Sequence, residues 1–313
     1  MSHYESKENA AVMAMSSTAV GWKRFRRRHA DAIIATIILG PMLLWWGVMY
    51  GIPIIFSFVL GFYEWIGIND RPKFVGFHNF VLFFQDKTYV ADLMRSIWMG
   101  GLVTLLSIIA GLGAALLMNL PLFGKGIYRT LWYVPVVTST IATTQVLNIL
   151  LNPVNGAVNQ AIEAMGFEPI LWQSSVFWSI VQICVYSVWK GVGTQALLWL
   201  AGLQSIDPVL YEAAEIDGAG RTGKFINVTL PGIKPIATYI VITGLIAAIQ
   251  IYEQVAFLTN GGPYGSTQVL VYRIIADGFF NFNLGMAGAS SVILATIVFI
   301  ASAAYYKLAQ DKD

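Results

Sequence analysis

Residues 97–118 read IWMGGLVTLLSIIAGLGAALLM, a run that contains no Asp, Glu, Lys or Arg. An α-helix needs about 20 mostly apolar residues to cross the hydrocarbon core of a bilayer. In lipid the backbone has no water to bond with, and a helix satisfies its N–H and C=O groups within the segment. This stretch therefore predicts a membrane-spanning helix and an all-α membrane fold.

The composition and five further apolar runs support the same fold class. The chain is 57% hydrophobic and 12% charged, about half the charged fraction of a typical soluble domain. We expect a polytopic protein with about six transmembrane helices, at roughly Ile33–Val59, Ile97–Met118, Leu131–Leu151, Val176–Leu203, Pro235–Leu258 and Leu284–Tyr306. The first is long and contains Pro41, Gly51 and Pro53, so we expect it to be tilted or kinked.

The distribution of Lys and Arg predicts the orientation. Basic residues concentrate before the first span, in the loops that follow spans two and four, and at the C-terminus. Since cytoplasmic segments carry the excess of Lys and Arg, both termini are predicted to be cytoplasmic. The apolar run after the Lys23–Arg28 cluster is longer than the ~7–15 residues of a signal peptide. We divide the chain into a cytoplasmic tail (1–31), a transmembrane permease domain (32–307) with a cytoplasmic loop (205–232), and a C-terminal tail (308–313).

Several function classes lack support in the sequence. The net charge of +2 gives no reason to expect nucleic acid, and membrane lipid is the expected surrounding. One cysteine and three scattered histidines make neither a disulfide framework nor a metal-ligand spacing. The motifs of metalloproteases, nucleophile-elbow hydrolases and P-loop ATPases are absent from the sequence. We therefore expect no catalytic residue, and no metal or cofactor bound by this chain.

Polar residues recur within three of the expected spans and suggest a pathway for a polar solute. Side chains four residues apart share one helix face. The residues concerned are Thr140, Thr144 and Asn148 in span three; Gln182, Tyr186, Lys190 and Thr194 in span four; and Gln250, Glu253 and Gln254, with Tyr252 beside them, in span five. Hydroxyls and amides can bond a polyhydroxylated ligand, and aromatic rings can cover its C–H faces. The alternative is hydrogen bonding between packed helices.

Two of these residues carry charge inside an expected span. Lys190 and Glu253 would contact a solute, including an anionic sugar, in a functional interpretation. In the alternative interpretation they form an ion pair with each other, or reach toward a membrane interface. We favour the structural alternative, because Glu253 lies near the outer end of its span.

The cytoplasmic loop contains the pattern of a short helix, Asp207–Gly218. Asp207 suits the N-cap, Pro208 the first helical position and Gly218 the C-terminal stop. A helix this short is marginal in water unless a partner covers it. Docking into a groove of another protein is one solution, and folding back on the chain's own bundle is the other.

The same loop resembles the EAA signature of the permeases of binding-protein-dependent ABC importers. It has Glu212-Ala213-Ala214, then Gly218 at the usual distance, then Val228 and Leu230-Pro231. The segments 128–135, 200–206 and 258–263 are similar to the carbohydrate branch, and the resemblance extends from about Ile33 to Lys307. It implies that an ATPase couples to the loop, and the residues expected to take part are Asp207, Tyr211, Glu212, Ala213, Ala214, Asp217, Gly218, Leu230 and Pro231.

The resemblance implies partners and a solute. Two permeases pair, so a second permease subunit is expected, with two nucleotide-binding subunits that hold ATP and Mg beneath and a solute-binding protein outside. Aligned on Glu212-Ala213-Ala214 and on Gly261-Gly262-Pro263, the sugar contacts of maltose-type relatives fall near Ser187, Lys190, Gly191, Thr194, Gly244, Ala247 and Ala248. Several of these differ from the maltose pattern, which leaves an oligosaccharide, a monosaccharide or glycerol-3-phosphate open.

A self-contained secondary transporter is the competing interpretation, with a membrane enzyme in the same class. Secondary transporters often show inverted repeats with broken helices that coordinate ions. The two halves of this sequence show no convincing repeat, and the Glu-Ala-Ala loop has no role in such a protein. The sequence therefore favours a non-catalytic importer subunit in the inner membrane.

Overall fold

The computed structural model describes residues 30, 32, 34–67, 71–120 and 124–310, in two units that divide after Ser57. The division falls within a helix whose apolar part runs through Ile34–Leu60 and which includes the π-turn η1 (Gly47–Gly51) and α2 (Ile52–Leu60). The π-turn directly precedes Pro53, whose missing N–H removes one helical hydrogen bond. The first span therefore contains a widened turn, and the expected tilt or kink stays a prediction.

The larger unit begins with a small hairpin and two helices. Strands β1 (Tyr63–Glu64) and β2 (Lys73–Phe74) pair antiparallel, and α3 (His78–Gln85) leads into α4 (Lys87–Asn119). The Asp86 side chain caps α4 by accepting a 2.7 Å bond from the N–H of Thr88, and this bond lowers the pKa of Asp86. At 33 residues, α4 is about 50 Å long and exceeds the ~30 Å hydrocarbon core.

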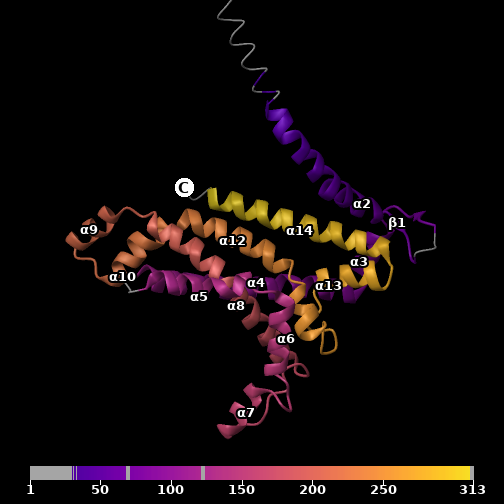
Figure 1. Ribbon diagram of the computed structural model, residues 1–313. Coiled ribbons are helices and arrows are strands. Elements are labelled where there is room, and N and C mark those ends of the chain that lie inside the picture. Colours follow the sequence, from indigo (N-terminus) through magenta and orange to yellow (C-terminus); the bar gives the residue numbers. More distant parts are fainter. Residues whose placement is uncertain (1–29, 31, 33, 68–70, 121–123, 311–313) are drawn as a thin grey trace, which may run out of the picture. The chain divides into compact units, whose positions relative to one another are not determined.

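Four helices form the bundle of this unit: α4, α8 (Val176–Gln204), α12 (Lys234–Ile249) and α14 (Leu284–Gln310). Helix α4 packs along both α8 and α12, and α14 packs on α12 and α3 (Figure 1). Glycines permit the close approaches, because a Cβ on Gly111 would collide with Gln195 and one on Gly100 would press on the Ala248 backbone. The core at these crossings combines small and branched side chains with larger ones such as Met118 and Trp199.

Two of the expected spans are broken in the structure. Helices α5 (Lys125–Val137) and α6 (Thr140–Leu150) meet at 94°, so the expectation of one continuous helix over Leu131–Leu151 is wrong. Pro135 lies near the end of α5, and Ser139 starts a new helix as the N-cap of α6. In the fifth expected span α12 ends at Ile249, and the π-turn η3 (Val255–Thr259) follows after a gap.

The number of membrane crossings depends on how two bent helix pairs are counted. Among the described residues, 4 helices are long and apolar enough to span a membrane, and up to 6 if each bent pair counts as one span. The second bent pair joins Arg221–Gly232 to α12 at 65° and comprises α10 (Arg221–Lys224), η2 (Phe225–Thr229) and α11 (Leu230–Gly232). The expected all-α membrane fold is confirmed, and about six spans stays a prediction.

The short helices lie at opposite ends of the larger unit. Helix α9 (Pro208–Ile216) and α10 are at one end, while α13 (Leu270–Ile275) and η4 (Ala276–Phe280) lie with α3 at the other (Figure 1). Helix α7 (Ala157–Ala164) follows α6. Buried Asn159 holds this connection together by bonding Pro153, Ile170 and the Trp172 ring.

A buried ionic network ties α4 to α13. The carboxylate of Asp92 is fully buried and pairs with Arg95, one turn along α4, and with Arg273 at 2.8 Å. Nearby, the Tyr89 hydroxyl donates to Asp277 at 2.6 Å, and Ser96 Oγ accepts from the N–H of Leu270 at 2.7 Å. Since Arg273 is far from Asp92 in the chain, no spacing pattern could reveal the pair.

We predict that Asp92→Asn destabilises the protein by about 3 kcal/mol. This is the low end of the range for broken buried ion pairs, because both arginines keep about a fifth of their side chains exposed. Thermal unfolding of the detergent-solubilised protein measures the change. Glu163→Gln, at an exposed site on α7, is the matched control, and equal unfolding temperatures for both variants would contradict the prediction.

Candidate functional site

A cavity of about 200 Å³, called here the polar cavity, lies between α4, α8 and α12. Its lining residues are Val103, Thr104, Ser107, Ser187, Lys190, Gly191, Gln195, Gly244, Ala247, Ala248, Ile251 and Gln254. The solute contacts implied at Ser187, Lys190, Gly191, Gly244, Ala247 and Ala248 are therefore brought together. The structure adds a wall from α4 that the sequence analysis missed, although Thr104 and Ser107 are polar residues three apart in the apolar second span.

Two side chains of the polar cavity hold unsatisfied polar atoms. Ser187 Oγ and Gln195 Oε1 are buried and have no hydrogen-bond partner among the described residues. Thr104 is different, since its hydroxyl bonds the carbonyl oxygens of Gly100 (2.8 Å) and Gly244 (3.2 Å). Buried polar atoms nearly always have partners. The polar cavity can therefore bond the hydroxyl groups or water of something that enters it.

The break after α12 forms an adjoining cavity of about 350 Å³, lined by Ala247, Gln250, Ile251, Tyr252, Glu253 and Gln254. It shares Ala247, Ile251 and Gln254 with the polar cavity. Gln250, Tyr252 and Glu253 were expected on a helix face, but they lie in and just after the break that follows Ile249. These three predicted residues thus continue the polar lining in a different geometry from the one expected.

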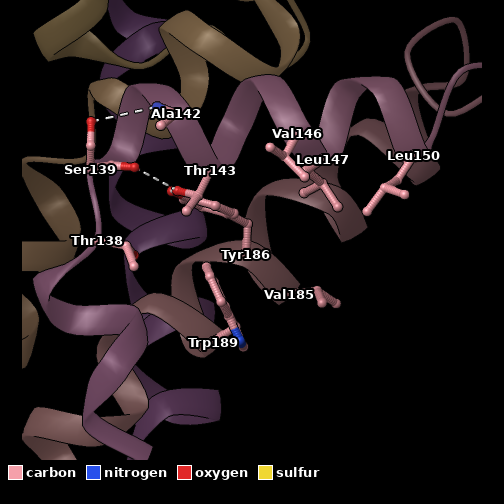
Figure 2. Close-up of a pocket in the computed structure, with 10 residues that line it drawn as sticks. All are labelled: Thr138, Ser139, Ala142, Thr143, Val146, Leu147, Leu150, Val185, Tyr186 and Trp189. Atoms are coloured by element: carbon pink, nitrogen blue, oxygen red, sulfur yellow. Dashed lines mark hydrogen bonds between the residues drawn. The ribbon is translucent and has the colours of Figure 1, made fainter. Parts of the chain in front are cut away.

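The largest of the three cavities, about 600 Å³, is the least suited to a polar solute. Its walls are mostly apolar and come from α6 and α8, with residues such as Val146, Leu150 and Val185. Figure 2 shows the polar groups gathered at one end, where the Tyr186 hydroxyl lies 2.6 Å from Thr143 Oγ1. Tyr186 is therefore placed beside the bend between α5 and α6, outside the polar cavity.

The remaining stripe residues serve packing or lie apart. Thr144 is fully buried and bonds the carbonyl of Thr140 in its own helix at 2.8 Å. Asn148 donates to the carbonyl of Phe257 at 2.8 Å and accepts from Gln182 at 3.4 Å, which links α6 to η3 and α8. Thr194 is exposed on α8, and the three cavities described do not include it.

Lys190 and Glu253 are not paired with each other in the structure. The Lys190 ammonium donates to the carbonyl oxygen of Thr138 and lies 3.3 Å from its hydroxyl. Glu253 is exposed at the break. The mutual ion pair considered from the sequence is therefore wrong, and Lys190 is engaged at the end of α5.

The loop 205–232 contains the expected helix with both expected ends. Asp207 caps α9 by accepting a 2.9 Å bond from the N–H of Val209, and Pro208 opens the first turn. At the other end Gly218 has φ +79, a conformation that suits glycine. The N–H groups of Gly218 and Ala219 bond back to Glu215 (3.0 Å) and Ala214 (2.8 Å), which is a Schellman motif.

One side of α9 is attached to the bundle. The Tyr211 hydroxyl lies 3.0 Å from Thr229 Oγ1, and its ring packs against a core cluster that includes Ile206 and Ile233. Lys224 donates to Glu215 at 2.6 Å, and this bond lowers the pKa of Glu215. The Tyr211 side of α9 therefore folds back on the chain's own bundle, which is the second alternative considered from the sequence.

The other side of α9 is uncovered. Val209, Leu210 and Ile216 are 62%, 53% and 87% exposed, and Glu212, Ala213 and Asp217 are exposed beside them. Apolar side chains on a water-facing helix form an interaction surface when they gather. We call these six residues the outer face of α9.

Comparisons with known proteins identify the family of the chain. The family model described as "Binding-protein-dependent transport system inner membrane component" matches residues 104–312. The chain is 30% identical over 288 residues to the sulfoquinovosyl glycerol transport system permease protein SmoG of Agrobacterium fabrum, covering 90% of this chain and 92% of that one. It is 33% identical over 227 residues to the sn-glycerol-3-phosphate transport system permease protein UgpA of Yersinia pestis, covering 72% and 77%.

A solved structure shares the fold. A chain of a bacterial ABC transporter involved in the import of the acidic polysaccharide alginate superposes with a TM-score of 0.78 at 22% identity, covering 93% of this chain and 98% of that one. The family match includes α8, the outer face of α9 and all of α12, which are the elements that build the site. The chain therefore belongs to the family of inner-membrane components of binding-protein-dependent transport systems.

Proposed function

We propose that this chain is the permease subunit of an ATP-driven importer and that it passes a sugar or a related polyol through the polar cavity. The observation that carries the proposal is the pair of unpartnered acceptors, Ser187 Oγ and Gln195 Oε1, in a cavity kept open by Gly191 and Gly244. Hydroxyl groups are donors that match such acceptors. The names of the two relatives, a sulfoquinovosyl glycerol and a glycerol-3-phosphate permease, support a polyhydroxylated solute.

The connection between α9 and the cavity supports an energy-coupling role for the loop. Helix α8 contributes Ser187, Lys190 and Gln195 to the polar cavity and ends at Gln204, four residues before α9 begins at Pro208. Through Tyr211 and Thr229, α9 also contacts the segment that leads into α12, which forms the opposite wall. A displacement of α9 by an ATPase would therefore act on both walls.

The proposed assembly includes partners that meet this chain at opposite ends. Two nucleotide-binding subunits hold ATP and Mg, and one of them docks on the outer face of α9. A second permease subunit stands beside this chain, and a solute-binding protein delivers the solute near the 261–265 loop at the far end. The termini are proposed to be cytoplasmic, on the side of α9. ATP hydrolysis takes place in the partner, and this chain is not an enzyme.

The alternative, a self-contained secondary transporter, would not depend on ATP. It would move solute through the purified chain in vesicles without ATP or partners. The importer requires the ATPase subunits and ATP. Uptake by the chain alone would overturn the proposal.

We predict that Gly218→Val uncouples the importer. Valine at φ +79 costs roughly 1–2 kcal/mol and disturbs the Schellman end of α9. ATP-driven uptake by the assembled complex should fall at least tenfold, and less ATPase should copurify, while the chain still inserts. Gly220→Ala is the matched control, since Gly220 has φ −69 and open space where the added Cβ would lie. Normal uptake with Gly218→Val would count against the coupling role.

We predict that Gln195→Met slows transport without preventing assembly. Methionine keeps the length of the side chain but removes the unpartnered amide oxygen from the polar cavity. A lost hydrogen bond of about 1 kcal/mol corresponds to a rate several-fold lower. Thr194→Val, next in the chain but exposed, should leave uptake unchanged. Equal rates for the two variants in proteoliposomes would remove Gln195 from the pathway.

A further inference from the structure

Three residues of α8 lie along the bend between α5 and α6. Tyr186, Lys190 and Gly193 are spaced by four and three residues, so they share one face of the helix. Each contacts a different part of the bent pair. Tyr186 contacts α6, Lys190 contacts Thr138 just after α5, and Gly193 contacts α5 itself.

Lys190 meets the end of α5. Thr138 is the C-cap of α5, and its carbonyl oxygen and hydroxyl both receive the Lys190 ammonium. The last carbonyl groups of a helix have no partner within it and carry a partial negative charge. The Lys190 ammonium donates hydrogen bonds and carries a positive charge, so it stabilises the C-terminal end of α5.

Tyr186 meets the start of α6. Its hydroxyl lies 2.6 Å from Thr143 Oγ1 and donates to the carbonyl of Thr140 at 3.3 Å, both in the first turn of α6 (Figure 2). Tyr186 is 3% exposed. Its buried hydroxyl is therefore hydrogen-bonded to the first turn of α6.

Gly193 fixes α5 on the other side of the bend. A Cβ at this position would fall on the carbonyl oxygen of Trp132, so the two backbones touch. This close contact leaves α5 little freedom to tilt away from α8. Non-helical backbone in a membrane needs polar partners from protein or water. Because side chains of α8 supply these partners, the bend has a fixed geometry.

We propose that Lys190 and Tyr186 are positioning residues that hold α5 and α6 at their 94° angle. In this role the charge of Lys190 acts on the end of α5 rather than on the solute, although its stem lines the polar cavity. The inference goes beyond the proposed function, because it concerns the shape of this chain and holds for any solute.

The first test measures the bend by the distance between two spin labels. Ile127 in α5 and Ile149 in α6 are 66% and 71% exposed, and the single native cysteine can be removed by Cys184→Ala. From a rise of 1.5 Å per residue, the two Cα atoms are about 22 Å apart at the observed bend and about 33 Å apart in a straight helix. Pulsed electron paramagnetic resonance on the complex in lipid nanodiscs resolves this range.

Lys190→Met should lengthen and broaden the distance distribution, and Lys190→Arg should restore it because arginine also donates to a carbonyl. Tyr186→Phe should broaden it to a smaller extent. If Lys190→Met does not yield folded protein, Lys190→Gln takes its place, since glutamine keeps a donor without the charge and should give an intermediate shift. An unchanged distribution in Lys190→Met, or in Lys190→Gln in its place, overturns the proposal.

The second test separates positioning from solute contact. A positioning role predicts that Lys190→Met lowers the maximal rate of ATP-driven uptake at least fivefold, equally for neutral and anionic solutes, with rescue by Lys190→Arg. A selective loss for an anionic solute, with the distance distribution unchanged, would make Lys190 a solute contact and refute the proposal. If uptake itself is absent in the parent complex, the proposed function fails while the distance measurement still decides the bend.

Discussion

The backbone of this protein must find hydrogen-bond partners wherever a helix stops inside the bundle. Lipid offers none, so each break has to be completed by protein or enclosed water. The chain meets this constraint with side chains from neighbouring helices. Lys190 bonds Thr138 where α5 ends, and Asn148 and Gln173 bond the carbonyls of Phe257 and Leu258 beyond the end of α12. Some polar residues inside the spans therefore bond the backbone where a helix breaks, and others line the cavities.

Helix α8 takes part in the packing of the bundle, in the bend and in the lining of the polar cavity. It packs on α4 through Gly111, holds the bend through Tyr186 and Lys190, and lines the polar cavity with Ser187 and Gln195. Its C-terminal end passes directly to α9. Because these roles fall on different faces of the same helix, a rotation of α8 would change the cavity and the bend together.

The sequence was sufficient where the signal is local or the motif is specific. The apolar runs locate α4, α8 and α14, and the cap and stop residues locate α9 within a residue at each end. The implied contacts at Ser187, Gly191, Gly244 and Ala248 come together in one cavity. Hydropathy failed at the bends, since the α5 and α6 segments have the composition of a continuous span. It also failed at Asp92, whose partner Arg273 is brought near only by the packing of α13 on α4.

The attachment of α9 has a mechanical consequence. Its N-terminal end follows α8 closely, Tyr211 anchors it near that end, and Gly218 ends it in a turn. Lys224 holds the part beyond Tyr211 a second time by donating to Glu215, and the widely exposed Ile216 lies beside this second attachment. A helix attached at two points moves as one piece, so a force on its outer face would act on the segment 221–232 as well as on the end of α8.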